Sequence, residues 1–441
     1  MMMKNKSINV FVVIAFLSLA YPMIVGLINK NNVPNLVGIV INPINPDSLL
    51  KKDKSMWFSG EYQTLKDDYN NDHWVFKEKF VRLNNQFYYD AFNQLRVNRF
   101  VSGKDNYVFS ETFIYSAYGD DYIGKFKISE KLRKAKVIQD TLKKKGIDLF
   151  LVFAPGKGEF CSEQIDDKYK HPITNTNYKD YISLCKQNQI NTLDLKAYFQ
   201  LLKPNTLYPL FPKFGHHWSY YGECLAVDTV IKFVEHLHHC DLPNMSWDHI
   251  DVVDTARSRD ADVLNSMNLF YSPKQNQKLA YPRISFEKDS VKNKTKLLAV
   301  ADSYWYGPVY MGVPQNCFAS GSFWYYYNKI IPNPSWASEK VEVWQLDLKQ
   351  EIESNQVIML LYSDGNLSSY SNAFIDDVYE LYTNPKLYYQ RNEKNKALKT
   401  NQKLIRETPN LLKKSTKKSQ DLQIPLDSAI KIDAMKMLGV K

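Results

Sequence analysis

Apolar segments of the buried-strand type alternate with amphipathic segments along most of this chain, and this alternation limits the possible folds more than any other feature. Residues 147–155 and 296–301 are apolar runs bounded by turn residues. Such runs are typical of strands that are buried on both faces of a parallel sheet. We expect further strands at 190–195, 341–346 and 357–362, and helices at 131–145, 178–189, 219–236 and 369–382. The pattern predicts an α/β fold with a mostly parallel sheet flanked by helices.

The first 30 residues predict a membrane anchor. Residues 7–29 are a run of 23 uncharged residues rich in Ile, Val, Leu and Phe, with Lys4 and Lys6 before them. In a helix at about 1.5 Å per residue, such a run crosses a bilayer core of about 30 Å. The preceding lysines favour a cytoplasmic N-terminus and an extracytoplasmic, periplasmic bulk. A cleaved signal peptide is the alternative, but the run is long and lacks a small-x-small cleavage site.

Beyond this single-pass anchor at 1–30, we expect a linker at 31–55, an α/β domain at 56–385 and a basic helical tail at 386–441. The tail has 14 Lys and Arg against 5 Asp and Glu, a surplus of nine out of a net charge of +10 for the whole chain. The body is therefore almost neutral, which argues against a nucleic-acid partner. The spacing of four apolar tail residues predicts a short helix that docks on its surroundings: Ile430, Ala434, Met435 and Leu438.

Ser303 and His217 are the residues best suited to nucleophilic catalysis. Ser303 directly follows the strand expected at 296–301, and open α/β sheets bind ligands at the carboxyl ends of their strands. It is suited to act as a nucleophile, with the backbone N–H of Tyr304 donating to the oxyanion. His217 lies on a loop before the helix at 219–236, where an imidazole is free to act as general base. Capping of a helix is the structural alternative for a serine in such a position.

The two blocks resemble the extracytoplasmic SGNH-hydrolase-like proteins of alginate and related polysaccharide O-acetylation. They read Gly215-His216-His217-Trp218-Ser219…Gly222 and Ala301-Asp302-Ser303-Tyr304, and the segments 101–109 and 153–157 also match. The His block precedes the Ser block, as in this permuted group and unlike ordinary GDSL esterases. The resemblance covers roughly residues 57–382 and implies an SGNH-like (flavodoxin-like) fold. It also implies Ser303 as nucleophile and His217 as base.

The chain departs from the family pattern at the third catalytic residue. The family has an acid two residues before the histidine, and this chain has Gly215 there. Loss of a triad carboxylate can lower the rate by about 10⁴. Asp260 and Asp262 lie in the nearest downstream acidic segment, and we nominate Asp262. A slow Ser–His dyad and a site that only binds are the alternatives.

Three tryptophans and a second histidine cluster are further candidates for binding. We expect Trp218, Trp305 and Trp324 to contact substrate, because aromatic faces suit sugar rings; packing in the core is the alternative. A second cluster consists of His236, His238, His239 and Cys240, but no acidic residue stands in helical register with it. We therefore expect no metal site and no cofactor.

The leading hypothesis is an exported O-acyltransferase that moves acetyl groups onto a cell-surface polysaccharide through a Ser–His site. The resemblance implies a polytopic, membrane-bound O-acyltransferase partner that delivers the acetyl groups. One rival is a deacetylase or esterase that uses the same site with water as acceptor. The other is a catalytically impaired glycan-binding subunit.

Overall fold

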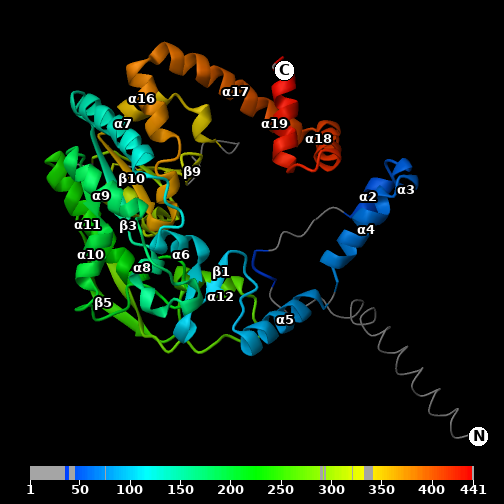
Figure 1. Ribbon diagram of the computed structural model, residues 1–441, viewed down its shortest axis with the longest axis horizontal. Helices are drawn as coiled ribbons and strands as arrows, with labels where there is room; N and C mark the ends of the chain where they lie inside the picture. Colours follow the sequence, from blue (N-terminus) through cyan, green and yellow to red (C-terminus); the bar gives the residue numbers. More distant parts are fainter. Residues whose placement is uncertain are drawn as a thin grey trace, which may run out of the picture.

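The computed structural model describes residues 35–38, 45–74, 76–288, 292, 295–319, 321–331 and 341–439 (Figure 1). The predicted anchor, residues 1–30, lies outside the described residues. Within the described part of the chain, no helix has the length and apolar character needed to cross a membrane.

A six-stranded mixed sheet forms the centre of the body, in the order β4-β3-β10-β7-β8-β9. Its strands are β3 (Asp148–Ala154), β4 (Thr192–Asp194), β7 (Leu297–Ala301), β8 (Ser322–Tyr325), β9 (Lys329–Ile331) and β10 (Val357–Ser363). Neighbouring strands are parallel except for the β8–β9 pair at one edge. The predicted α/β class and the mostly parallel sheet are therefore confirmed.

Helices cover both faces of the sheet, which explains why the central strands are apolar at almost every position. Alternate residues of β3 point to opposite faces: Phe150 and Val152 join one core cluster, and Leu149 and Leu151 join the other. The first cluster includes α10 (Leu195–Leu202) and α11 (Tyr220–His238), and the second includes α7 (Lys125–Lys143), α9 (Asn177–Gln187) and α16 (Phe374–Thr383). The β3 and β10 strands are buried along their whole length.

The remaining elements surround this body. Before it come α2 (Pro46–Leu50), α3 (Ser55–Phe58), α4 (Glu61–Asp72), α5 (Lys77–Phe92), β1 (Phe100–Ser102), β2 (Val108–Ser110) and α6 (Glu111–Tyr118). Within it lie α8 (Lys157–Phe160), the antiparallel pair β5 (Met245–Val253) and β6 (Leu279–Phe286), α12 (Asp262–Ser266), α13 (Tyr306–Tyr310), α14 (Val313–Asn316) and α15 (Leu348–Glu353). Short 3₁₀ turns are η1 (Lys104–Asn106), η2 (Ser162–Gln164), η3 (Asp167–Tyr169), η4 (Ser258–Ala261), η5 (Ser303–Trp305), η6 (Val343–Gln345) and η7 (Asp364–Ser369).

Some predicted elements differ from the observed ones for local reasons. The segment 341–346 is not a strand, because Glu342 and Gln345 form a capping box that starts the turn η6. The helix expected at 369–382 begins only at Phe374, since η7 precedes it. Helix α7 begins six residues earlier than expected, at Lys125. Its C-terminal stop is as predicted, with Gly146 in the left-handed region at φ +76°.

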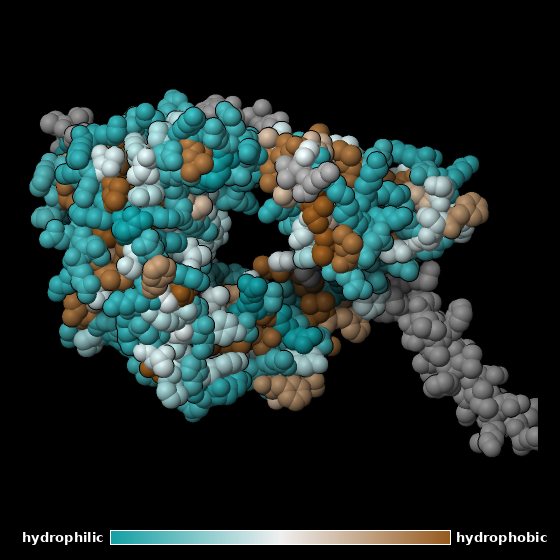
Figure 2. All heavy atoms as spheres, turned by 45° about the horizontal axis from the view of Figure 1, so that its top comes forward, coloured by the Kyte–Doolittle hydropathy of each residue, from teal (hydrophilic) through white to brown (hydrophobic). Residues whose placement is uncertain are grey.

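The tail forms three helices, α17 (Pro385–Glu407), α18 (Pro409–Asp421) and α19 (Leu426–Met437). Ile430 and Ala434 of α19 are buried with Ile405 of α17, so the predicted docking helix packs within the tail itself. In Figure 1, α2–α4 and α18–α19 lie on the same side of the body, and Lys413 of α18 forms an ion pair with Glu61 of α4 at 2.9 Å. Figure 2 shows an opening between the body and these helices.

Candidate active site

Ser303 lies where β7 ends, at the carboxyl edge of the sheet. The residue before it, Asp302, is fully buried and ties this turn to the end of β10. Its Oδ2 accepts hydrogen bonds from the backbone N–H and the hydroxyl of Ser363, both at 2.7 Å, and from Asn366 at 2.9 Å. Because Asp302 is held on several sides, the position of the adjacent Ser303 is fixed before any ligand arrives.

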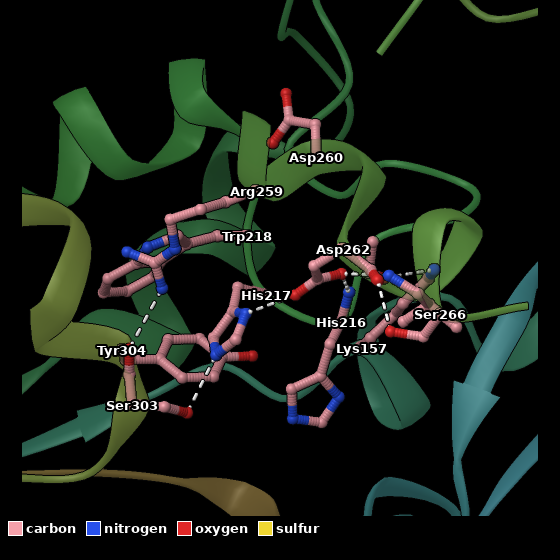
Figure 3. A network of polar contacts seen from close by, with 12 residues as sticks. Lys157, His216, His217, Trp218, Arg259, Asp260, Asp262, Ser266, Ser303 and Tyr304 are labelled. Carbon is pink, nitrogen blue, oxygen red and sulfur yellow. Dashed lines mark hydrogen bonds and ion pairs between the residues drawn. The ribbon is translucent and has the colours of Figure 1, made fainter. Parts of the chain in front are cut away.

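His217 faces Ser303 from the loop that precedes α11. The loop ends at Ser219, whose hydroxyl accepts a hydrogen bond from the Gly222 N–H at 3.1 Å and caps the helix. The Ser303 hydroxyl lies 2.8 Å from His217 Nε2, within hydrogen-bonding distance (Figure 3). This is the geometry that a serine nucleophile and its general base require.

Asp262, the first residue of α12, lies on the other side of the imidazole. Its Oδ2 is 3.1 Å from His217 Nδ1, and its Oδ1 accepts the backbone N–H groups of His216 at 2.9 Å and Val263 at 2.7 Å. Burial raises the pKa of Asp262, but the hydrogen bond from His217 and the charge of that ring outweigh burial, so the pKa lies below its usual value. A charged carboxylate can only accept, so it orients Nδ1–H towards itself and leaves Nε2 to accept from Ser303.

Comparison with known families gives one match that spans all three residues. Residues 100–303 match the family described as SGNH hydrolase-like domain, acetyltransferase AlgX. The match covers slightly less than half of the chain and shows that this segment is similar to that family. The resemblance inferred from the sequence is therefore confirmed, and the α/β body has the SGNH-like fold. A comparison with curated protein sequences gives no significant match.

Solved structures similar to this chain have low identity and low TM-scores. The O-acetyltransferase domain of Pseudomonas putida AlgJ is 16% identical with a TM-score of 0.43, covering 64% of this chain and 98% of that one. Pseudomonas aeruginosa AlgX is 14% identical with a TM-score of 0.40, covering 63% and 67%. Bacillus cereus PatB1 is 13% identical with a TM-score of 0.38, covering 62% and 98%.

Gly215 of this SGNH hydrolase-like domain occupies a position with no room for a side chain. A Cβ atom built there would lie 2.4 Å from Pro212 Cγ and 2.9 Å from the backbone oxygen of Asp260. The loop therefore packs closely against the segment that carries Asp262. The same close approach leaves no space for the acid that the family pattern places at 215.

Lys157 holds the histidine loop in place by hydrogen bonds. The sequence alone did not predict it as a site residue. Its side chain is buried, and Nζ donates to the backbone oxygens of Lys213 at 2.7 Å and Gly215 at 2.9 Å. Burial lowers the pKa of Lys157 to about 7. Lys157 is the last residue of the segment 153–157, which resembles the family pattern. This resemblance is the sequence feature that could have identified it as a site residue.

His216 points away from Ser303 although it is adjacent to His217. Its ring stacks on Phe113 with the centroids 4.7 Å apart. Burial lowers the pKa of His216 to about 3, so the ring is neutral at ordinary pH and a poor proton acceptor. The two rings lie edge to face with their centroids 4.8 Å apart, and in Figure 3 only His217 is joined to Ser303.

The donor predicted for the oxyanion is already used in this structure. The buried Tyr304 N–H donates to Asp302 Oδ1 at 3.0 Å, so it is not free to donate to a ligand. The prediction assumed that a turn directly after a strand leaves its N–H groups open. Here the Asp302 side chain caps its own turn instead.

The three tryptophans expected to contact substrate are buried. Trp218, Trp305 and Trp324 are 3%, 2% and 0% exposed. Trp305 and Trp324 belong to the cores on opposite faces of the sheet, which excludes a sugar from either ring as placed. Trp218 donates Nε1–H to Glu223 Oε1 at 3.1 Å and borders a cavity of about 340 Å³. Packing in the core, the alternative, therefore describes Trp305 and Trp324.

Arg259 and Glu223 connect the Ser block to the His block. The sequence did not predict either of them as a site residue. Arg259 Nη2 donates to the backbone oxygen of Ser303 at 3.0 Å, and Nη1 donates to Glu223 Oε1 at 3.3 Å. Burial raises the pKa of Glu223, while the charge of Arg259 opposes that rise. Arg259 lies in the same short segment as Asp262. Predicting this segment at the site therefore also implied that Arg259 lies near it.

The second histidine cluster has separate partners. His238 Nδ1 lies 2.8 Å from Asp148 Oδ2, and His239 takes a left-handed conformation that ends α11. Within the described residues, no group of three or more His, Cys, Asp or Glu side chains is arranged to hold a metal ion.

Proposed function

We propose that this protein is an exported O-acyltransferase that moves acetyl groups onto a cell-surface polysaccharide. The family of residues 100–303 is by its description one of acetyltransferases. The observation that carries the proposal is the line of hydrogen bonds from the Ser303 hydroxyl through His217 to Asp262. The three residues come from a strand end, a loop before a helix and the start of another helix. Their convergence on one point argues for a shared chemical role.

In the first half-reaction, Ser303 Oγ attacks the carbonyl carbon of the acetyl donor. His217 Nε2 takes the hydroxyl proton and returns it to the leaving group, so an acetyl ester forms on Ser303 as the donor bond breaks. In the second half-reaction, His217 takes the proton of a sugar hydroxyl, whose oxygen attacks the ester. Ser303 regains the proton and the acetylated sugar leaves. Asp262 stays ionised throughout and stabilises the imidazolium in both halves.

The location of the protein forms part of the proposal. Residues 1–30 anchor the chain, residues 31–55 link the anchor to the body, and the catalytic domain acts outside the cytoplasm. Acetyl-CoA is a cytoplasmic donor, so a membrane-bound O-acyltransferase partner delivers the acetyl group across the membrane. What supports this arrangement is the uncharged run at 7–29 and the lysines before it.

A sulfonyl fluoride tests the nucleophile directly. Full-length protein is incubated with the probe and digested, and the adduct is located by mass spectrometry. We expect modification of Ser303 in the wild type and none in His217→Asn, because the base must activate the hydroxyl. The absence of any adduct on Ser303 in folded wild-type protein would favour the glycan-binding subunit.

The acceptor is tested with the acetylated enzyme. Release of the acetyl group is followed with and without an added polysaccharide acceptor. A transferase retains the ester until a sugar hydroxyl is present and then forms acetylated glycan. Rapid release as free acetate, unchanged by the glycan, would support the esterase and contradict transfer.

A further inference from the structure

Helix α5 exposes large apolar side chains and buries two polar ones, the reverse of an ordinary surface helix. Phe80, Leu83 and Phe87 follow one another at helical spacing and are 56%, 58% and 59% exposed. On another side of the helix, Asn85 and Gln86 are buried. We refer to Phe80, Leu83 and Phe87 as the α5 stripe. A row of large apolar side chains on a protein surface indicates that something covers it.

Aromatic rings extend the stripe at both of its ends. The exposed Trp74 ring stacks on that of Phe80 with the centroids 5.2 Å apart. At the other end, the exposed Phe92 ring meets that of Phe87 edge to face at 5.8 Å. The exposed apolar surface therefore runs from just before the first turn of α5 to its last residue.

The buried side of α5 is fixed on the segment 262–271, which begins at the candidate catalytic carboxylate. Asn85 Nδ2 donates to the backbone oxygen of Met267 at 2.9 Å. Gln86 Oε1 accepts the backbone N–H of Tyr271 at 3.2 Å. Because these polar groups hold the helix in its present orientation, the stripe cannot turn inward to be covered by the body.

The chain before α5 is tied to the same place. The backbone oxygen of Asn35 accepts a hydrogen bond from Arg82 of α5 at 3.4 Å. The backbone of Val37 makes two hydrogen bonds with the side chain of Asn268, one at 2.8 Å and one at 3.0 Å. Residues 35–37 therefore lie beside α5.

The proposed anchor ends only six residues before Asn35. Its uncharged run is 7–29, and an extended chain covers about 3.6 Å per residue, so at most about 22 Å separates residue 29 from Asn35. The run reaches across the apolar core of a bilayer, and a headgroup layer several ångströms thick lies beyond that core. Since α5 is bonded to Asn35, it stays close to the membrane surface.

We infer that α5 lies in the plane of the membrane surface, with the α5 stripe inserted among the lipids. At 16 residues α5 is too short to cross a bilayer core, which takes about 20. Lys79, exposed next to Phe80, is suited to meet lipid phosphates. Asp90, near the other end of the helix, accepts a hydrogen bond from the Tyr271 hydroxyl at 2.5 Å, which offsets its charge within the protein. The inference rests on the proposed function for the anchor at 1–30.

A membrane-bound α5 also holds the candidate active site close to the bilayer. Tyr89 of α5 packs in one cluster with Phe214 of the histidine loop and Val263, the residue after Asp262. The helix and the site therefore belong to one packed unit, beside each other in Figure 1. The site then faces the place where the proposed partner releases acetyl groups. The stripe orients the body, whereas an anchor alone fixes only one point of it.

A fluorophore on the stripe tests its depth in the membrane. Phe87→Cys is labelled with nitrobenzoxadiazole in a Cys240→Ser background, because the other four cysteines are buried. The full-length chain is placed in nanodiscs of phosphatidylethanolamine and phosphatidylglycerol, with or without lipids that carry a nitroxide near the headgroup. We expect the nitroxide to quench this reporter at least about twofold more than one at Phe126→Cys, because an interfacial helix lies about 5–10 Å deep. Phe126 is an exposed residue of α7, on the other side of the body in Figure 1.

Matched pairs of substitutions test the stripe itself. Phe80→Ser with Leu83→Ser removes two of its members, and Phe126→Ser with Leu207→Ser removes two large exposed apolar residues elsewhere. At the Phe87→Cys reporter, the stripe pair should lose at least about half of the quenching and the control pair less than about a tenth, since interfacial binding scales with the apolar area inserted. Circular dichroism checks that both pairs fold. Equal losses in the two pairs would overturn the inference.

A protein partner on the stripe would overturn it as well. Disulfide formation between two unlabelled Phe87→Cys chains in the membrane would assign the stripe to a second copy. A Phe87→Cys reporter that the nitroxide lipids do not quench, in a chain of intact mass, would refute the inference and leave the anchor standing. Loss of residues 1–30 from the purified chain would refute the anchor, and the inference with it. The sulfonyl fluoride result at Ser303 depends on neither measurement, so the proposed chemistry and the membrane-bound helix fail separately.

Discussion

The candidate active site and helix α17 hold their polar side chains in opposite ways. At the site, Asp302 and Asp262 each accept at least three hydrogen bonds, and Ser303 and His217 are held between them. On α17, Lys396 donates to the backbone oxygen of Leu346 at 3.2 Å, and Lys399 has no ion pair among the described residues. The first arrangement fixes each carboxylate with several hydrogen bonds, whereas the charges of Glu342 and Asp377 only partly oppose the lowering of the Lys399 pKa by burial.

This difference corresponds to two different physical tasks. A site that forms and breaks bonds gains from donors and acceptors that are already oriented, since no reorganisation is then needed in the transition state. The lysines of a surface helix have no such requirement, because their long side chains reach water and do not need a fixed partner. Substitutions at the site should therefore reduce the rate sharply, while substitutions of α17 lysines should change it little.

The largest effect is expected at His217, which tests whether one member of the pre-organised network carries the chemistry. His217→Asn should lower acetyl transfer by about 10⁴-fold or more, because the general base is lost. His216→Asn is the matched control and should lower it less than about tenfold, because that ring is buried, neutral and directed away from Ser303. Transfer is measured as acetylated glycan formed. An inactive His216→Asn beside an active His217→Asn would contradict the geometry.

Asp262 tests whether the charge of the network matters beyond its shape. Asp262→Asn keeps the size of the side chain but removes the anion that stabilises the imidazolium, so we expect a loss of about 10²–10⁴ in kcat. Asp260→Asn, two residues earlier, should have a much smaller effect, since Asp260 accepts from the Tyr220 N–H and makes no contact with His217. Similar losses in both variants would point to general disruption of the segment.

Gly215 tests how tightly the network is packed. Gly215→Ala and Gly215→Asp should each destabilise the fold by about 1–3 kcal/mol in denaturant unfolding, because a Cβ meets Pro212 and the Asp260 backbone. If the family acid cannot be accommodated, Gly215→Asp should also reduce transfer. Increased transfer by Gly215→Asp would show instead that the loop retains the family geometry and lacked only the charge.

Asp260 should affect the rate of acetyl transfer least of the residues tested here, and it should show itself in the pH dependence of stability instead. Burial raises the pKa of Asp260 to about 7 in the folded protein, above its ordinary value of 3.8. Between these values the folded state binds more protons than the unfolded state, so wild-type stability should fall as pH rises from 4 towards about 7. Asp260→Asn should remove this part of the dependence, worth at most about 1.4 kcal/mol per pH unit. Parallel unfolding curves from pH 5 to 8 for both proteins would contradict it.

Much of the body could be predicted from local pattern, because the pattern reflects burial. The strands β3, β7 and β10 were expected from runs of apolar residues, and these runs are apolar because helices cover both faces of the sheet. Ser303 at a strand end and His217 before a capped helix are likewise local features, set by the residues around them. The capping box at η6 shows where local pattern fails to predict the fold. The side chains of Glu342 and Gln345 each bond the backbone of the other residue, and a turn forms where a strand was expected.

What the sequence determined by itself was therefore the class of fold, the family and the local setting of Ser303 and His217. Only the tertiary structure decided which distant groups meet them. Asp262 is 45 residues from His217 in the chain, and Asp302 uses the N–H of Tyr304 that looked free. The tryptophans near the two blocks went into the core, since their large apolar area favours burial over exposure. Contacts between segments far apart in sequence depend on how whole elements pack, and a local pattern carries no record of that packing.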